Sequence, residues 1–238
     1  MLTNTTPSTP NELQPPSSQE QGKLPSIPRP TPLSLEEVQK LLTDPRVTPD
    51  RRVFYALSVL TGARFSEVAA LRWGHCNFDD GAPDDEYNLA RVEIRPELKG
   101  RAYKYRSPRL IPMHPALRQV LLKWRDEGWQ AACGRPPTHE DLVVPRVGLP
   151  ATMRRPDSER LHWHRNLETL CIPKRSMHSQ RYAFAHLCQE AGMPLEVTFA
   201  MLGRAVPKSY PGDHESPRWV TRCKYMRMIP LVLPSASI

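Results

Sequence analysis

An arginine at the corner between two expected helices is the residue whose position most suggests chemistry. Arg64 lies in the segment Leu60–Trp73, just after Gly62 and just before the next apolar helical pattern. A planar guanidinium held in such a corner can grip one oxyanion in a fixed direction, because its N–H donors form a rigid fork. Far downstream, His178 is followed three residues later by Arg181. Together these groups indicate phosphate chemistry.

Cleavage of a DNA strand by a side chain, without metal, makes three chemical demands. The charge on the phosphoryl oxygens must be neutralised by fixed donors, and arginine suits this task because it stays charged at any working pH. The leaving sugar hydroxyl needs a proton, which lysine or histidine can supply. A tyrosine can act as the nucleophile and keep the bond energy in a phosphate ester.

Several segments resemble motifs of the tyrosine recombinases, the phage-integrase family. Thr61–Glu67 resembles the first arginine box of that family, and His178–Ala185 resembles its H-x-x-R box. Arg109–Met113 resembles the end of the hairpin that carries the active-site lysine, and Leu202–Arg204 stands where the family has Leu-Gly-His. The resemblance covers about residues 33 to 228. It implies an α+β, mainly helical catalytic domain with a small antiparallel β-sheet.

The resemblance also implies roles for individual residues. Arg64 and Arg181 would hold the scissile phosphate, and Glu67 would buttress Arg64. Glu67 can equally be a carboxylate that complements the positive end of a helix dipole, and the two interpretations are compatible. His178 would accept a proton or bind the phosphate; alternatively, it is a capping or core histidine.

The expected hairpin contains the candidate for the general acid. Lys104 best matches the family lysine by its distance from Pro112, and it would protonate the leaving 5′ hydroxyl. Lys99 is the alternative if the turn is longer, and either lysine can instead touch a phosphate or be solvated. Arg106 and Arg109 are interpreted as contacts to the DNA backbone or as solvated charges.

Two departures from the family pattern bear on catalysis. Arg204 replaces the second histidine of the family, and an arginine can donate to a phosphate oxygen but cannot accept a proton. The family register places the nucleophile near position 213, which is occupied by Asp213 and followed by His214. Tyr210 lies slightly before this position and is the favoured nucleophile. Tyr225 lies further after it and is the alternative.

Composition supports a polyanionic partner. The 238 residues carry a net charge of +8 and a pI of about 9.4, which favours nucleic acid, although a basic protein without such a partner is also possible. The five cysteines form no C-x-x-C pair, which indicates reduced thiols in a cytoplasmic protein. The sequence has no signal peptide or membrane-length apolar run. The resemblance implies double-stranded DNA as partner, self-association on DNA, and no cofactor or metal.

The elements that must position these residues are mostly helices. A capping box at Ser34–Glu37 predicts a helix that turns Leu35, Val38, Leu41 and Leu42 inward. Gly62 is expected to end the second helix, and Ser66 is expected to cap the third. Alternation predicts a strand pair. The remaining expected elements are a helix at 51–61, strands at 90–95 and 109–113, a helix from Pro115, a loop-rich stretch at 133–158, and helices at 159–170, 178–191, 195–202 and 217–228.

The expected domain organisation is simple. Residues 1–32 are rich in Pro, Ser, Thr, Gln and Asn, so we predict a disordered tail or linker. Residues 33–230 form the recombinase-like domain, and 231–238 form a C-terminal tail. The proline-rich segment stands where the family has a DNA-clamping helical domain, which indicates a short or truncated chain.

Three functions compete. An active recombinase would cut and rejoin DNA through a 3′-phosphotyrosine intermediate with Tyr210 as nucleophile. A catalytically decayed relative would bind DNA without cleaving it. A helix-turn-helix regulator ranks last, because it leaves the register of Arg64, His178 and Arg181 unexplained.

Overall fold

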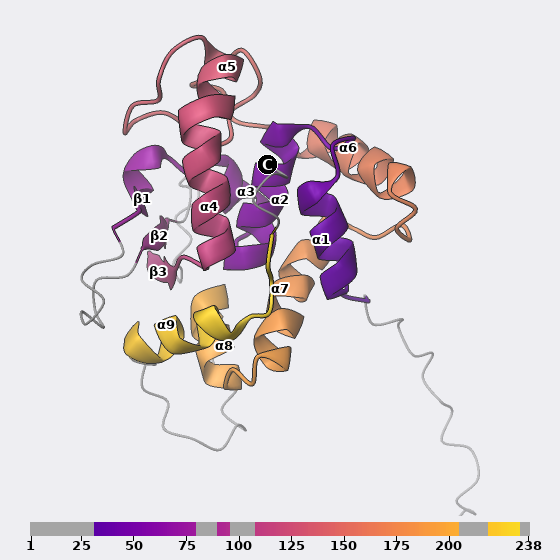
Figure 1. The fold of residues 1–238 in the computed structure, drawn as a ribbon, viewed down its shortest axis with the longest axis vertical. Helices are drawn as coiled ribbons and strands as arrows, with labels where there is room; N and C mark the ends of the chain where they lie inside the picture. Colours follow the sequence, from indigo (N-terminus) through magenta and orange to yellow (C-terminus); the bar gives the residue numbers. More distant parts are fainter. Residues whose placement is uncertain (1–30, 80–89, 96–107, 205–218, 234–238) are drawn as a thin grey trace, which may run out of the picture.

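A buried central helix, α2 (Pro49–Thr61), organises the structure, a computed structural model that describes residues 31–79, 90–95, 108–204 and 219–233 (Figure 1). Nearly every residue of α2 is buried, as expected of a helix packed on all sides. Helices surround it, and a small sheet lies to one side. The other helices are α1 (Leu35–Thr43), α3 (Phe65–Ala69), α4 (Pro115–Lys123), α5 (Trp129–Cys133), α6 (Pro156–Thr169), α7 (Ser179–Glu190), α8 (Leu195–Leu202) and α9 (Trp219–Met228).

The sheet is antiparallel with strand order β1 (Cys76–Asn77), β2 (Arg91–Ile94), β3 (Arg109–Pro112). Val92 pairs with Ile111 across β2 and β3, and both are buried, which confirms the expected strand pair. β1 is absent from the sequence prediction because two residues are too short to show an alternating pattern.

Local signals set most helix ends correctly. The Ser34 side chain accepts a hydrogen bond from the Glu37 backbone, and Glu37 returns one to the Ser34 N–H, so the predicted capping box is present. Gly62 adopts a left-handed conformation with φ of 59° and ends α2. Left-handed Gly192 and Gly203 likewise follow α7 and α8.

Three helices begin earlier than expected, and α2 does so at Pro49 instead of about residue 51. Ser66 does not cap α3; the helix begins at Phe65 with Arg64 as the N-cap residue. The reason is that the Glu67 carboxylate, rather than a hydroxyl, accepts the free backbone N–H of Arg64. The stretch 133–158 is less open than predicted, because α6 already begins at Pro156 in the favourable first helical position.

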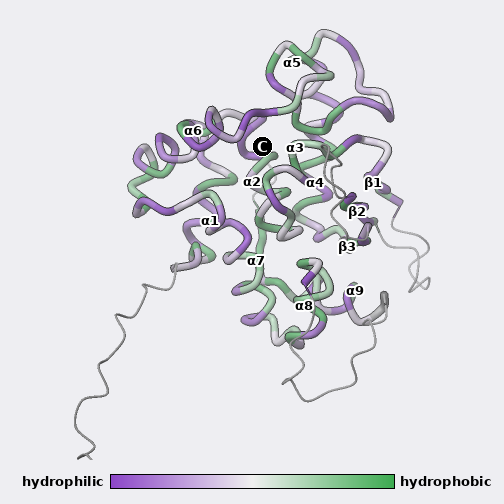
Figure 2. The backbone as a smooth tube through the Cα atoms, turned by 180° about the vertical axis from the view of Figure 1, so that it is seen from behind, coloured by the Kyte–Doolittle hydropathy of each residue, from purple (hydrophilic) through white to green (hydrophobic). Residues whose placement is uncertain are grey.

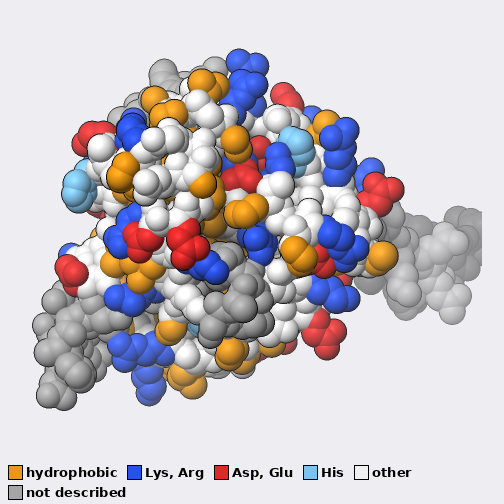
Figure 3. All heavy atoms as spheres, turned by 45° about the horizontal axis from the view of Figure 1, so that its top comes forward, with side chains coloured by type: hydrophobic (Ala, Val, Ile, Leu, Met, Phe, Trp, Pro, Cys, Tyr) orange, Lys and Arg blue, Asp and Glu red, His pale blue; other side chains and the backbone are white. Residues whose placement is uncertain are grey.

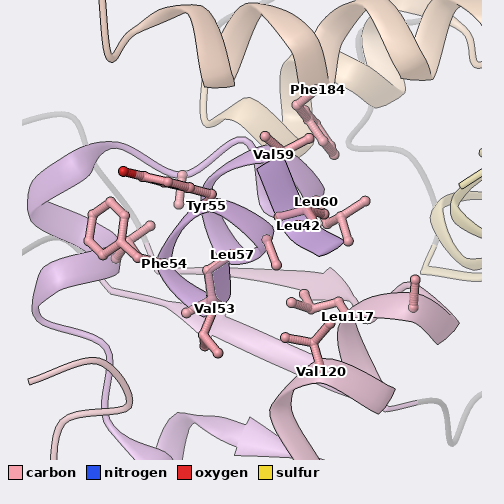
Figure 4. Packing of buried hydrophobic residues seen from close by; sticks show 14 of the residues in the cluster. Leu42, Val53, Phe54, Tyr55, Leu57, Val59, Leu60, Leu117, Val120 and Phe184 are labelled. Carbon is pink, nitrogen blue, oxygen red and sulfur yellow. The ribbon is translucent and has the colours of Figure 1, made fainter. Parts of the chain in front are cut away.

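The core joins α2 to α4 and α7. Phe184 of α7 packs against the end of α2 near Val59, and Leu117 and Val120 of α4 approach from another side (Figure 4). Hydrophobic segments gather around α2, whereas α6 is largely hydrophilic (Figure 2). The core also includes Leu231 and Leu233, which the sequence assigned to a C-terminal tail.

Several predicted features lie outside the described residues. These are positions 1–30 of the N-terminal tail, the candidate nucleophile and its register, and the hairpin turn, including Lys99, Lys104, Arg106, Tyr210, Asp213 and His214. Within the described ranges, no helix combines the length and apolarity needed to span a bilayer.

Candidate functional site: an arginine cluster

The turn at Gly62 presents Arg64. Because Gly62 reverses the chain after α2, Arg64 sits at the start of α3, as the sequence indicated. Its backbone N–H donates to Glu67 Oε2 at 2.8 Å, and its Nη1 donates to Glu67 Oε1 at 3.1 Å. The Arg64 side chain remains about a quarter exposed (25%), so it is anchored on one side and open on the other.

Arg181 approaches the same turn from α7 and is almost fully buried. Its Nη1 donates to the Gly62 carbonyl, and its Nη2 donates to the Leu202 carbonyl at 2.5 Å. One guanidinium therefore ties the first turn of α7 to the ends of α2 and α8. Its Nε has no hydrogen-bond partner among the described residues.

Glu67 connects the cluster to the sheet through Arg109. Arg109 Nη1 and Nη2 donate to the two oxygens of Glu67 at 3.1 and 2.7 Å, and Arg109 Nε donates to the Met201 carbonyl at 2.7 Å. The interpretation of Arg109 as a solvated charge is therefore wrong, whereas a contact of Arg109 to the DNA backbone stays a prediction. The side chain is only 9% exposed, because it is held between α3 and the end of α8.

The carboxylate stays ionised in this setting. Burial by itself would raise the pKa of Glu67, but the hydrogen bonds and charge of Arg109, together with those of Arg64, lower it below the ordinary value. Glu67 thus serves as the counter-charge for two arginines and also accepts the first free N–H of α3. Both interpretations made from the sequence hold for its contacts.

His178 and Arg204 lie at the exposed edge of the cluster. The His178 ring meets Tyr182 edge to face with centroids 5.0 Å apart. Partial desolvation and the charges of Arg181, Arg204 and Arg64 lower the pKa of His178, so the neutral ring is favoured at neutral pH. A neutral imidazole can accept a proton, a task that the arginine at 204 cannot perform.

Positive charge exceeds negative charge here. Burial and the charges of Arg64, Arg109 and Arg204 lower the pKa of Arg181 to about 9, so these four arginines are close enough to repel one another. Among the described residues, Glu67 is the carboxylate paired with the cluster. An anion bound here would relieve the repulsion.

A small pocket opens between α2, α3 and α7. Its volume is about 60 Å³, and Arg64, His178 and Arg181 line it together with Gln180, Ser58, Ala63 and the apolar residues Phe54, Phe65 and Met177. The fold therefore brings Arg64 together with His178 and Arg181, two predicted site residues that lie far from it in sequence. No group of metal-ligating side chains lies near enough to hold an ion in the parts of the chain that the structure describes.

The two tyrosine candidates have different outcomes. Tyr225 lies on α9 and is partly buried against the hydrophobic core. Tyr210 and Lys104 lie outside the described residues, so their roles stay predictions.

The sequence interpretation missed the pairing of Arg109 with Glu67 and gave no role to Gln180. Arg109 could have been suspected from Glu67, since a carboxylate on a short helix flanked by apolar residues needs a partner when it is buried. Gln180 lies two residues after His178, at a helix position that faces the core. A polar side chain at such a position could have indicated a role in the site.

No protein-family model matches this chain, and no curated protein matches it in sequence. Solved structures do match. The integrase from mycobacterium phage Brujita superposes with a TM-score of 0.58 at 16% identity, covering 89% of this chain and 62% of that one. XerA recombinase gives 0.58 at 14% identity, with 87% and 61% covered.

The Tn1549 transposon integrase, in complex with circular intermediate DNA, gives a TM-score of 0.56 at 16% identity. The match covers 85% of this chain and 62% of that one, so the chain spans about three fifths of the length of these proteins. At such identities the likeness establishes the fold. The α+β, mainly helical architecture predicted from the sequence is thus confirmed, and the chain has the catalytic-domain fold of the tyrosine recombinases.

Proposed function

We propose that this chain binds double-stranded DNA and holds a backbone phosphate between Arg64 and Arg181. The observation that carries the proposal is the excess of arginine over carboxylate in one cluster, with Arg64 open to solvent and Arg181 tied to carbonyls. On the face seen in Figure 3, Lys and Arg side chains lie among acidic and apolar ones. The mixture of charges on this face does not define a basic surface for DNA, so the proposal depends on the arginine cluster.

The proposed reaction is cutting and rejoining of DNA through a 3′-phosphotyrosine, as a site-specific recombinase or integrase performs it. The tyrosine hydroxyl, Tyr210 by preference, attacks phosphorus, and the bond to the leaving 5′ oxygen breaks. Lys104 gives that oxygen its proton. Neutral His178 takes the proton of the nucleophile, and Arg204 donates to a phosphate oxygen.

A second candidate is a relative that binds DNA without cleaving it. Arginine at position 204 favours this alternative, because it removes a proton acceptor from the cluster. The contact of Tyr225 with the core favours it too, since that side chain would have to leave its packing to act. For the active recombinase, self-association on DNA is part of the proposal, because recombination joins two sites.

A covalent trap separates the two candidates. The full chain is incubated with nicked DNA substrates that release a short fragment after cleavage and so prevent rejoining. An active recombinase leaves a protein–DNA adduct that survives denaturation, is lost in Tyr210→Phe and persists in Tyr225→Phe. Salt-sensitive DNA binding without an adduct, unchanged in both variants, supports the second candidate. Binding that is insensitive to salt contradicts both.

A further inference from the structure

Three consecutive residues at the start of α7 carry buried polar atoms that lack partners. Among the described residues, Ser179 Oγ, both amide atoms of Gln180 and Arg181 Nε make no hydrogen bond. Ser179 is 1% exposed and Gln180 is 2% exposed. Buried polar groups of native proteins are rarely left unsatisfied, so a concentration of them calls for a missing partner such as water or an ion.

The pocket distinguishes among these atoms. Gln180 and Arg181 line it together with Arg64, whereas Ser179 does not. The pocket, at about 60 Å³, has room for more than one oxygen-sized group, since one water needs about 10–15 Å³. The lining thus includes the two side chains that carry the unpartnered Nε–H and amide, together with the guanidinium-bearing side chain of Arg64.

These groups select the chemistry of the occupant. Two of the five N–H groups of Arg181 are directed to the Gly62 and Leu202 carbonyls, and its buried Nε–H makes no hydrogen bond among the described residues, so this side chain still has donors for a ligand. The Gln180 amide nitrogen offers two further N–H donors. Donors in excess, next to uncompensated positive charge, fit an anionic oxygen better than they fit a neutral or cationic group.

We propose that Gln180 is a third, uncharged donor to the phosphate that Arg64 and Arg181 hold. Its amide N–H and the Arg181 Nε–H donate to one phosphate oxygen at the mouth of the pocket, and its carbonyl oxygen accepts from a water deeper in the same pocket. The proposal rests on the proposed function, because it assigns a further contact to the same phosphate. It also explains why a polar amide occupies a position that packs in the core.

Replacing Gln180 with methionine distinguishes a role in binding from a role in stability. Methionine is similar in length and needs no hydrogen bond, so Gln180→Met removes the unsatisfied amide from the empty protein and removes the donor from the bound one. The Tm of the free protein should stay level or rise by about 3 °C. The Kd for inorganic phosphate should increase about tenfold. A merely structural glutamine would give the opposite pattern, with a loss of stability and unchanged binding.

The matched control is Ser179→Ala. Ser179 is as buried as Gln180 and, among the described residues, its Oγ likewise makes no hydrogen bond, but it does not line the pocket. Its replacement should leave phosphate binding unchanged. Arg64→Ala is the control for the clamp itself and should abolish the binding of phosphate.

The experiment is a calorimetric titration of the full chain and its variants with inorganic phosphate. An NMR titration of the wild type, following the assigned side-chain amide of Gln180, needs no variant to fold. A tenfold loss in Gln180→Met, with a phosphate-dependent shift of the amide signal, supports the proposal. If Gln180→Met binds like wild type, or the amide signal is unmoved, while Arg64→Ala loses binding, the role of Gln180 is overturned and the clamp stands. If wild type and Arg64→Ala bind alike, or neither binds, the clamp itself fails.

Discussion

Glu67 accepts hydrogen bonds from both terminal nitrogens of Arg109, so a carboxylate on α3 and a guanidinium on β3 form a bidentate pair at the base of the arginine cluster. The same carboxylate accepts hydrogen bonds from the backbone N–H and from the side chain of Arg64. Arg109 also reaches the Met201 carbonyl near the end of α8. These hydrogen bonds hold the sheet, α3 and α8 together, and Glu67 orients the Arg64 side chain.

The pair should contribute strongly to stability, because breaking it leaves a buried charge with fewer partners. We expect Arg109→Ala to lower the free energy of unfolding by about 3 kcal/mol. A double-mutant cycle with Glu67→Gln should give a coupling of at least about 1 kcal/mol. Urea denaturation measures both. Arg160→Ala, which removes an exposed pair with Asp157, should cost no more than about 0.5 kcal/mol. Equal losses at positions 109 and 160 would contradict the assignment.

The lowered pKa of Glu67 predicts a specific pH dependence. A carboxyl whose folded-state pKa lies below its unfolded-state value stabilises the protein above the unfolded value, and this contribution is lost as the pH falls through the folded value. The difference in unfolding free energy between wild type and Glu67→Gln should therefore be full at pH 7. It should shrink below about pH 4.5, the ordinary value for this group. Denaturation curves at pH 7, 5, 4 and 3 measure it; a gap independent of pH would show that the Glu67 charge is not involved.

Arg64 should make one phosphate contact. Loss of one such contact reduces the slope of log affinity against log salt by about 1, and the affinity for DNA should fall roughly tenfold. Fluorescence anisotropy of labelled duplex DNA at several salt concentrations gives both quantities for Arg64→Ala. Arg160→Ala is the matched control, because Arg160 is an exposed arginine paired with Asp157. The prediction fails if the two variants change the slope equally.

Gly62 is required for two reasons at once. Its φ of 59° is strained for other residues, and an added Cβ would lie 2.5 Å from Phe184 Cδ1 and 2.7 Å from Leu202 Cδ2. We expect Gly62→Ala to cost at least about 2 kcal/mol, from backbone strain plus overpacking. Gly192 has a similar φ of 69° but open space around it, so Gly192→Ala should show the backbone strain alone, about 1 kcal/mol. Thermal unfolding of both variants checks the difference.

The parts of the site that the sequence predicts are those carried by local patterns. Gly62 and the arginine after it predicted the corner, and the spacing of His178 and Arg181 predicted the first turn of α7. Their convergence could be expected only through the resemblance, since no local pattern brings α2 next to α7.

The parts that the sequence misses depend on contacts between distant residues. The alternating pattern of the strand does not show whether the Arg109 side chain is buried or exposed. Its partner Glu67 lies on another element, so the sequence does not reveal the pair. Ser66 has the better intrinsic preference for a cap, but Glu67 accepts the backbone N–H of Arg64, two positions closer to the turn, and α3 starts earlier. In both cases a tertiary or side-chain contact outweighs the local preference.

The two carbonyls that hold Arg181 belong to the carboxyl ends of α2 and α8, where the partial negative charge of a helix dipole gathers. This cation is therefore stabilised by aligned peptide dipoles instead of a mobile carboxylate. Such dipoles cannot swing away or compete for the donors that a phosphate needs. In the part of the chain that the structure describes, a ligand arriving at Arg181 consequently has no hydrogen-bonded carboxylate to displace, and little of its binding energy is lost to rearranging the protein.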